Sequence, residues 1–160
     1  DGEIEYEGEL NENGEPHGRG KKIYSNGTYD GEWKNGMKNG EGTRNWHEGE
    51  IVYEGEWKDD KMNGKGTYKW ADGRSYEGGF KDGKSHGKGI TKRPDGSVMY
   101  DGQYNEGWRH GNGTYNYPNG DVYKGKWHAD KKHGEGVMTY ANQDIYDGEW
   151  KDGRKDGKGT

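Results

Sequence analysis

Residues 53–75 read YEGEWKDDKMNGKGTYKWADGRS, and this 23-residue stretch decides the fold. Tyr53, Gly55 and Trp57 alternate with acidic residues, which is the period-two pattern of a strand with one apolar face. Residues 64–70 alternate in the same way, with Gly, Gly, Tyr and Trp on one face and Lys, Thr and Lys on the other. The stretch therefore predicts a β-hairpin whose aromatic and glycine positions share a face.

The same pattern recurs along the whole chain of 160 residues. A Tyr followed two residues later by Gly returns every 23 or 24 residues, at Tyr6, Tyr29, Tyr53, Tyr76, Tyr100, Tyr123 and Tyr146. A fixed period of this length is typical of repeat proteins, in which each unit packs on its neighbours. We treat residues 1–160 as a single domain with units 6–28, 29–52, 53–75, 76–99, 100–122 and 123–145, and a partial unit 146–160.

These units predict an all-β fold: an elongated single-layer antiparallel meander of tandem hairpins, with about 13 or 14 strands, twisted and curved into a rod or half-pipe. Asn-Gly and Asp-Gly pairs favour type I′ turns, and we expect such turns between units at Asn26-Gly27, Asp72-Gly73, Asp95-Gly96 and Asn119-Gly120. Within the units, Asp60 and Asp130 replace a loop glycine, and Asp tolerates the same left-handed backbone.

Composition narrows the class of protein. Apolar residues make up 24% of the chain, yet 13% is aromatic and 33 residues are glycine, so an aliphatic core is excluded. No run of about 20 apolar residues could form a transmembrane helix. The absence of Cys excludes disulfides and thiolate zinc sites and fits a reducing compartment such as the cytoplasm. A net charge of −5 argues against nucleic acid as a partner. Because the chain begins at Asp1, we expect it to be a segment of a longer protein.

The aromatic face is the candidate binding surface. Rings can lie flat on glycine backbone and form a thin core, but a single-layer sheet has no second layer to cover them. Exposed apolar patches usually mark interaction sites. We expect a groove that binds a protein partner, either a peptide segment or neighbouring subunits, through the second-strand aromatics Tyr24, Trp46, Tyr68, Trp70, Tyr115, Tyr117 and Tyr140.

No residue pattern indicates catalysis, a metal or a cofactor. Four histidines recur at one repeat position, His17, His86, His110 and His133, and units about 10 Å apart would keep them too far apart to share a metal. His47 and His128 show no partner in the sequence. The acidic pairs of the first strands are interpreted as a solvated ladder of cross-strand charge pairs. We therefore expect a protein that is not an enzyme.

Basic residues gather in the loops within the units, which would align along one edge of the sheet. Such an edge either keeps the protein soluble or contacts an anionic membrane, at about 1 kcal/mol per nearby charge. The lysines that we single out for lipid binding are Lys124, Lys126, Lys131 and Lys132.

The pattern Tyr-Glu-Gly-Glu-Trp-Lys, followed by Gly-x-Gly-Thr-Tyr and Asp-Gly, resembles the MORN repeat (membrane occupation and recognition nexus). Residues 53–75 and 146–160 are the most similar, and the resemblance extends over essentially the whole chain. It departs at Leu10, which replaces the Trp, and at Gln143, which replaces a turn Gly.

The resemblance implies a fold of tandem hairpins and a role as an adaptor, scaffold or membrane-associated module. The first repeat, around residues 6–20, is similar to that of radial spoke head proteins, which implies a cytoskeletal or axonemal assembly in a cilium. It is less closely similar to that of a SET-domain methyltransferase. MORN modules also occur beside lipid kinase domains, so a targeting module of a larger enzyme stays open, as does a homodimer.

Overall fold

The computed structural model describes residues 3–160, apart from the side chains of residues 3, 4 and 48. The chain forms strands and one short 3₁₀ turn, η1 (His47–Gly49). The strands are β1 (Glu3–Leu10), β2 (Pro16–Tyr24), β3 (Gly27–Lys34), β4 (Met37–Trp46), β5 (Ile51–Lys58), β6 (Lys61–Lys69), β7 (Ser75–Lys81), β8 (Lys84–Lys92), β9 (Val98–Asn105), β10 (Trp108–Asn116), β11 (Val122–His128), β12 (Lys131–Thr139), β13 (Ile145–Lys151) and β14 (Arg154–Gly159).

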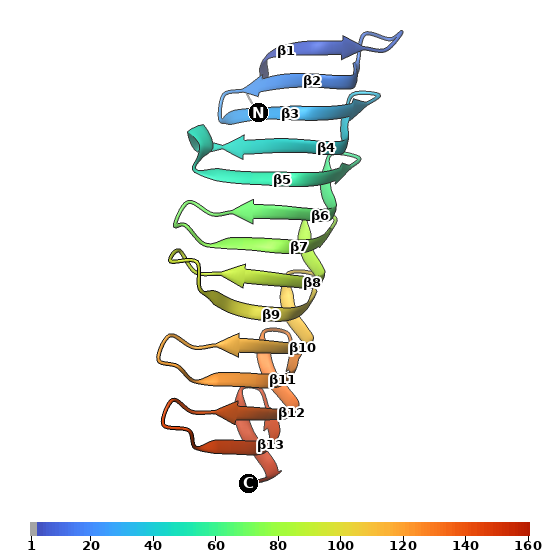
Figure 1. Ribbon diagram of the computed structural model, residues 1–160. Coiled ribbons are helices and arrows are strands. Elements are labelled where there is room, and N and C mark those ends of the chain that lie inside the picture. Colours follow the sequence, from blue (N-terminus) through green and yellow to red (C-terminus); the bar gives the residue numbers. More distant parts are fainter. Residues whose placement is uncertain (1–2) are drawn as a thin grey trace. The chain divides into compact units, whose positions relative to one another are not determined.

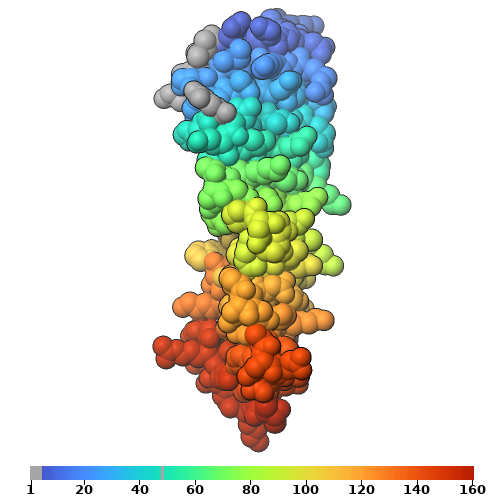
Figure 2. Space-filling model, turned by 60° about the vertical axis from the view of Figure 1, so that its left-hand side comes forward, coloured from blue at the N-terminus to red at the C-terminus, as the bar shows by residue number. Residues whose placement is uncertain are grey.

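The strands follow one another in sequence order in a 14-stranded antiparallel sheet that does not close into a barrel (Figure 1). This confirms the predicted all-β meander. The chain divides into two compact units, residues 1–84 and 85–160, which are described separately below. Within each unit the colours of Figure 2 succeed one another in sequence order, as expected when each repeat packs on its neighbours.

The tight turns lie within the repeats. Asn35 and Gly36 both have positive φ, 48° and 86°, which is the signature of a type I′ turn. Asp59 and Asp60 adopt the same conformation with φ of 48° and 71°, so Asp does replace the loop glycine as expected. The predicted type I′ turns between repeats are wrong. At Asp72-Gly73, Gly73 alone has positive φ, and the loop is closed by hydrogen bonds between Trp70 and residues 73 and 74.

The core consists of tyrosine rings lying on glycine pairs. Gly31 and Gly42 are opposite each other on β3 and β4, and a Cβ atom on Gly42 would lie 2.1 Å from the hydroxyl of Tyr29. That hydroxyl donates a hydrogen bond of 2.9 Å to the carbonyl of Glu32. The same arrangement recurs in the later repeats, where the fully buried rings are Tyr53, Tyr100 and Tyr123. Most first-strand rings are therefore buried by the sheet itself, which confirms the predicted packing on glycine.

Tryptophan side chains join four of the repeats to the preceding one. The indole Nε1 of Trp33 donates to the carbonyl of Gly20 at 3.0 Å, and Trp127 donates to Gly113 at 3.1 Å. Each indole also meets the neighbouring Tyr rings edge-on. Phe80 occupies the same position without a ring N–H. The first-strand Tyr and Trp rings therefore form the core, and the second-strand side chains make up the rest of the aromatic face.

The acidic side chains of the opposite face have a structural role that the sequence analysis missed. The carboxylate of Glu56 accepts a hydrogen bond of 2.7 Å from the backbone N–H of Lys65, beside Gly64, whose φ is 93°. Glu32 does the same for Glu41 at 2.9 Å. Among the described side chains, no ion pair joins opposite strands on this face. Opposite charges do lie across from each other in the first strands, where Lys21 is opposite both Glu7 and Asp30. In later repeats Glu is opposite Glu, and carboxylates bind the backbone where the pairing is irregular.

Candidate functional site: the aromatic face

In each of the two units, the predicted groove residues lie on the face that carries the Tyr and Trp core of that unit, and all seven are half-buried. The registers prove the common face, since Tyr68 is opposite Tyr53 and Tyr115 is opposite Tyr123. In the first unit the rings of Trp46 and Trp70 lie 6.1 and 4.9 Å from that of Tyr68. In the second unit the partners Tyr115 and Tyr117 are 4.7 Å apart. Tyr24 and Tyr140 instead lie beside cations.

Cations alternate with these rings, which the sequence analysis did not expect. Arg44 is buried, with its guanidinium carbon 4.4 Å from the ring centre of Tyr24 and 4.8 Å from that of Trp46. Burial lowers the pKa of Arg44. Lys38 lies over Trp57 at 5.3 Å and pairs with Asp60 at 3.5 Å. Cations over aromatic faces are attracted by the ring quadrupole. The face therefore carries positive charge as well as apolar surface.

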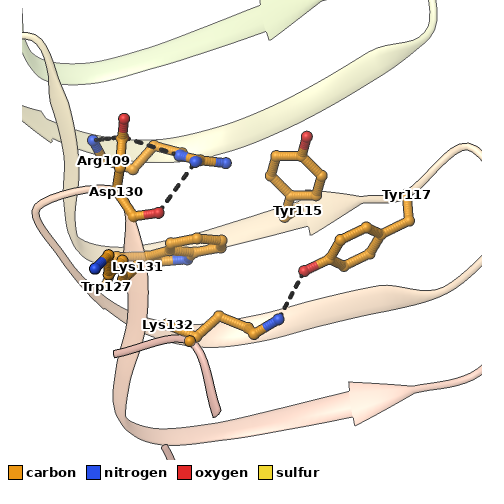
Figure 3. A pocket seen from close by; sticks show the side chains of 8 residues that line it. Arg109, Tyr115, Tyr117, Trp127, Asp130, Lys131 and Lys132 are labelled. Atoms are coloured by element: carbon orange, nitrogen blue, oxygen red, sulfur yellow. Dashed lines mark hydrogen bonds and ion pairs between the residues drawn. The ribbon is translucent and has the colours of Figure 1, made fainter. Parts of the chain in front are cut away.

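A pocket of about 210 Å³ opens on this face in the second unit (Figure 3). Its aromatic walls are Tyr115, Tyr117 and Trp127, and its polar lining includes Arg109 and Lys132. Arg109 and Tyr115 lie on β10, Trp127 on β11 and Lys132 on β12, whereas Tyr117 directly follows β10. Asp130, Lys131 and Gly153 complete the lining. The site is thus assembled from consecutive repeats.

The two cations of the pocket are held in different ways. Arg109 donates through Nε to a carboxylate oxygen of Asp130 at 3.1 Å and through Nη2 to its carbonyl at 3.1 Å. Its guanidinium carbon lies 4.7 Å from the ring centre of Trp127. Lys132 donates from Nζ to the Tyr117 hydroxyl at 2.9 Å and lies 4.9 Å from the ring centre of Trp150. Arg109 is therefore partly neutralised, whereas Lys132 is bound to a neutral hydroxyl.

The four lysines considered for lipid binding do not share a surface. Lys124 and Lys126 alternate with Tyr123, Gly125 and Trp127, so they point to the face opposite the rings. Lys131 is exposed at the start of β12. Lys132 is half-buried on the aromatic face. Lys132 follows Trp127 by five residues, and this spacing is visible in the sequence. Only the strand register, in which Lys132 is opposite Trp127, shows that the lysine lies on the aromatic face.

Histidines meet on the opposite face of the second unit. The ring of His128 lies 5.1 Å from that of His110 and 5.6 Å from that of His133, so the expectation that His128 has no partner is wrong. At His17 and His86 the Nδ1 atoms accept hydrogen bonds from the backbone N–H of Asn35 and Glu106. Across residues 3–160, no group of three or more His, Cys, Asp or Glu side chains is arranged to hold a metal ion.

The face opposite the rings, which carries the histidines, also has a wider hollow of about 590 Å³. It lies over the glycine pairs of β9, β10 and β11 and is lined by polar side chains, including Lys88, Asp101, Gln103 and Lys124. Unlike the smaller pocket, it has no aromatic wall.

No helix in the described part of the chain is long and apolar enough to cross a membrane.

Comparison with known proteins supports a repeat assignment for the whole chain. The model of the MORN repeat matches seven times, at residues 6–28, 29–51, 53–73, 76–98, 100–122, 123–145 and 146–160. These ranges agree with the units expected from the sequence to within two residues at their ends. No individual curated protein matches the chain. The matched repeats extend from residue 6 to residue 160, and the chain belongs to the MORN repeat family.

Proposed function

We propose that the chain is a non-enzymatic scaffold that binds a segment of a partner protein across its aromatic face. The observation that carries this proposal is the set of half-buried second-strand rings on the face where most first-strand rings are already buried. The fold does not need the outer surface of these rings. Tyr, Trp and Arg are also the residues that dominate binding energy at protein interfaces. The row therefore has the composition of a docking surface.

The proposal is tested by capturing partners from cell extract at about 0.3 M salt, where long-range charge attraction is screened. Trp70→Ala and Tyr117→Ala should each lose the captured protein while keeping the circular dichroism of the native chain. Trp108→Ala is the matched control, because Trp108 is 54% exposed and lies outside the groove set. Retention of the partner by both groove variants, or loss of folding in both, would contradict the proposal.

The type of assembly is a finer proposal. The first repeat, residues 6–20, supports a cytoskeletal or axonemal scaffold similar to radial spoke head proteins. A targeting role for a larger enzyme is the competing proposal, and the sequence of the full-length protein would separate the two.

An anionic membrane is the alternative ligand. It would use Lys124, Lys126, Lys131 and Lys132, but the first two point away from the face that carries the last. One flat bilayer cannot contact both faces at once, so the geometry favours a protein segment. Binding to anionic vesicles that collapses above about 0.15 M salt, with no retained protein, would support the membrane instead.

A further inference from the structure

The aromatic face of residues 85–160 is cationic although the chain as a whole has a net charge of −5. The acidic residues of its strands all point to the opposite face, since they alternate with the Gly, Tyr and Trp positions: Asp101, Glu135, Asp147, Glu149 and Asp156. The aromatic face instead presents Arg109, Lys132 and Lys155. The candidate binding surface is therefore positively charged although the whole chain has a negative net charge.

The three cations form a regular ladder. They lie on β10, β12 and β14, at intervals of 23 residues, and each is opposite the large aromatic residue of the preceding strand. Successive rungs are separated by two strand spacings, or about 10 Å. Each cation lies over rings of the face, and Lys155 is 5.3 Å from the ring centre of Tyr140 and 4.8 Å from that of Tyr146.

The three cations of the ladder still have hydrogen-bond donors that could bind an anion. Among the described residues, neither Lys132 nor Lys155 pairs with a carboxylate. The hydrogen bonds of Arg109 to Asp130 use its backbone N–H, Nε and Nη2, which leaves Nη1 without a partner in the described part of the chain. Arg109 and Lys132 are half-buried among rings and partly stripped of water, so a carboxylate that reaches them gains more than it would at the exposed Lys155.

We propose that the aromatic face of residues 85–160 binds an acidic segment whose carboxylates are spaced about 10 Å apart, in register with Arg109, Lys132 and Lys155. This rests on the proposed function and specifies the partner's chemistry. Carboxylates seven residues apart on a helix, at about 10.5 Å, meet the spacing. Carboxylates three residues apart on a polyproline II chain, which has three residues per turn, share one face at about 9.3 Å and also meet the spacing. The pocket of about 210 Å³ admits a single side chain between its aromatic walls.

The test uses synthetic peptides of about 20 residues, measured by fluorescence anisotropy against the 160-residue chain. One is an alanine-rich helix with Glu at every seventh position and Leu four residues after each Glu. Another is a proline-rich peptide in the polyproline II conformation with Glu at every third position. Each has a partner peptide in which Gln replaces Glu. We expect at least one Glu peptide to bind about tenfold more tightly than its Gln partner.

Variants locate the contact. Arg109→Met with Lys132→Met should weaken Glu-peptide binding by about tenfold, because both cations of the pocket are removed. Lys124→Met with Lys126→Met is the matched control: it makes the same change of charge on the opposite face and should leave binding unchanged. Lys132→Met alone should lose part of the affinity, and it keeps the Arg109–Asp130 contacts intact if the double variant fails to fold.

Three results would overturn the inference. Equal binding of Glu and Gln peptides, lost in Tyr117→Ala, would leave the proposed function standing and remove the charge requirement. Equal weakening by the two double variants would reduce the effect to overall charge. Failure of both Glu peptides to bind, whether or not vesicles containing phosphatidylserine bind, would show that the ladder does not recognise an acidic segment.

Discussion

Strands β6 and β12 have the same place in their repeats but differ at two positions of the aromatic face: Tyr68 corresponds to Met138, and Met62 corresponds to Lys132. Met62 is opposite Trp57 on β6, and Lys132 is opposite Trp127 on β12. Both strands keep the glycine pair under a buried Tyr. The difference teaches that the Tyr, Gly and Trp positions determine the frame, whereas the residue five after the Trp is free to set the chemistry of the surface.

The largest expected effect tests the shared frame. A Cβ atom on Gly66 would lie 2.3 Å from the Tyr53 hydroxyl, and one on Gly136 would lie 2.1 Å from that of Tyr123. Either Gly→Ala substitution displaces a buried ring, so each should lower the free energy of unfolding by about 3 kcal/mol in urea titrations. Gly107→Ala is the control: it meets no atom within 4 Å and should cost about 1 kcal/mol for its φ of 89°. Equal losses in all three variants would contradict the ring-on-glycine core.

Alkaline pH should destabilise the repeats of both β6 and β12, because each contains a buried Tyr ring. Burial raises the pKa of Tyr123 to about 12 and also raises that of Tyr53. A raised pKa in the folded state means that folding favours the neutral phenol, so its contribution is complete below pH 10 and is lost as the pH rises toward 12. Urea midpoints measured at rising pH should fall over this interval, in step with tyrosinate absorbance. Full ionisation near pH 10 without unfolding would be inconsistent with buried rings.

A smaller effect separates repeats that carry Trp from the one that carries Phe. Trp127→Phe removes the hydrogen bond of 3.1 Å from Nε1 to the Gly113 carbonyl while keeping a ring in place. The expected cost is about 1 kcal/mol in the free energy of unfolding. Phe80→Trp, the reverse change, should not destabilise the chain. A loss above about 3 kcal/mol for Trp127→Phe would mean that indole packing, rather than the hydrogen bond, joins the repeats.

The smallest effect on stability is expected at the position of Met62 and Lys132. Met62→Lys and Lys132→Met exchange residues that the repeat already uses at this place, so each should change the free energy of unfolding by no more than about 0.5 kcal/mol. Thermal unfolding of the two variants beside the native chain is the measurement. A large loss in either would show that this position belongs to the frame after all.

The sequence alone was sufficient to predict the meander and the common face of the rings, because strand alternation and a 23-residue period are visible in it. It placed the type I′ turns wrongly, since the pairs at Asn35-Gly36 and Asp59-Asp60, not those between repeats, have two positive φ angles. It also missed the role of Glu56 at the irregular pairing of β6 and the position of Lys132 on the aromatic face. Both depend on register beside a bulge, where one residue decides which face a side chain occupies.

The most direct test of the central claim is a hydrogen-exchange footprint of a bound Glu peptide on the native chain. The account predicts slower backbone exchange in β10, β12 and β14, which carry Arg109, Lys132 and Lys155, and unchanged exchange in β6, which carries Met62. Protection that is equal in the two regions, or greater in β6, would contradict it, because the cation ladder would then have no part in choosing where the partner binds.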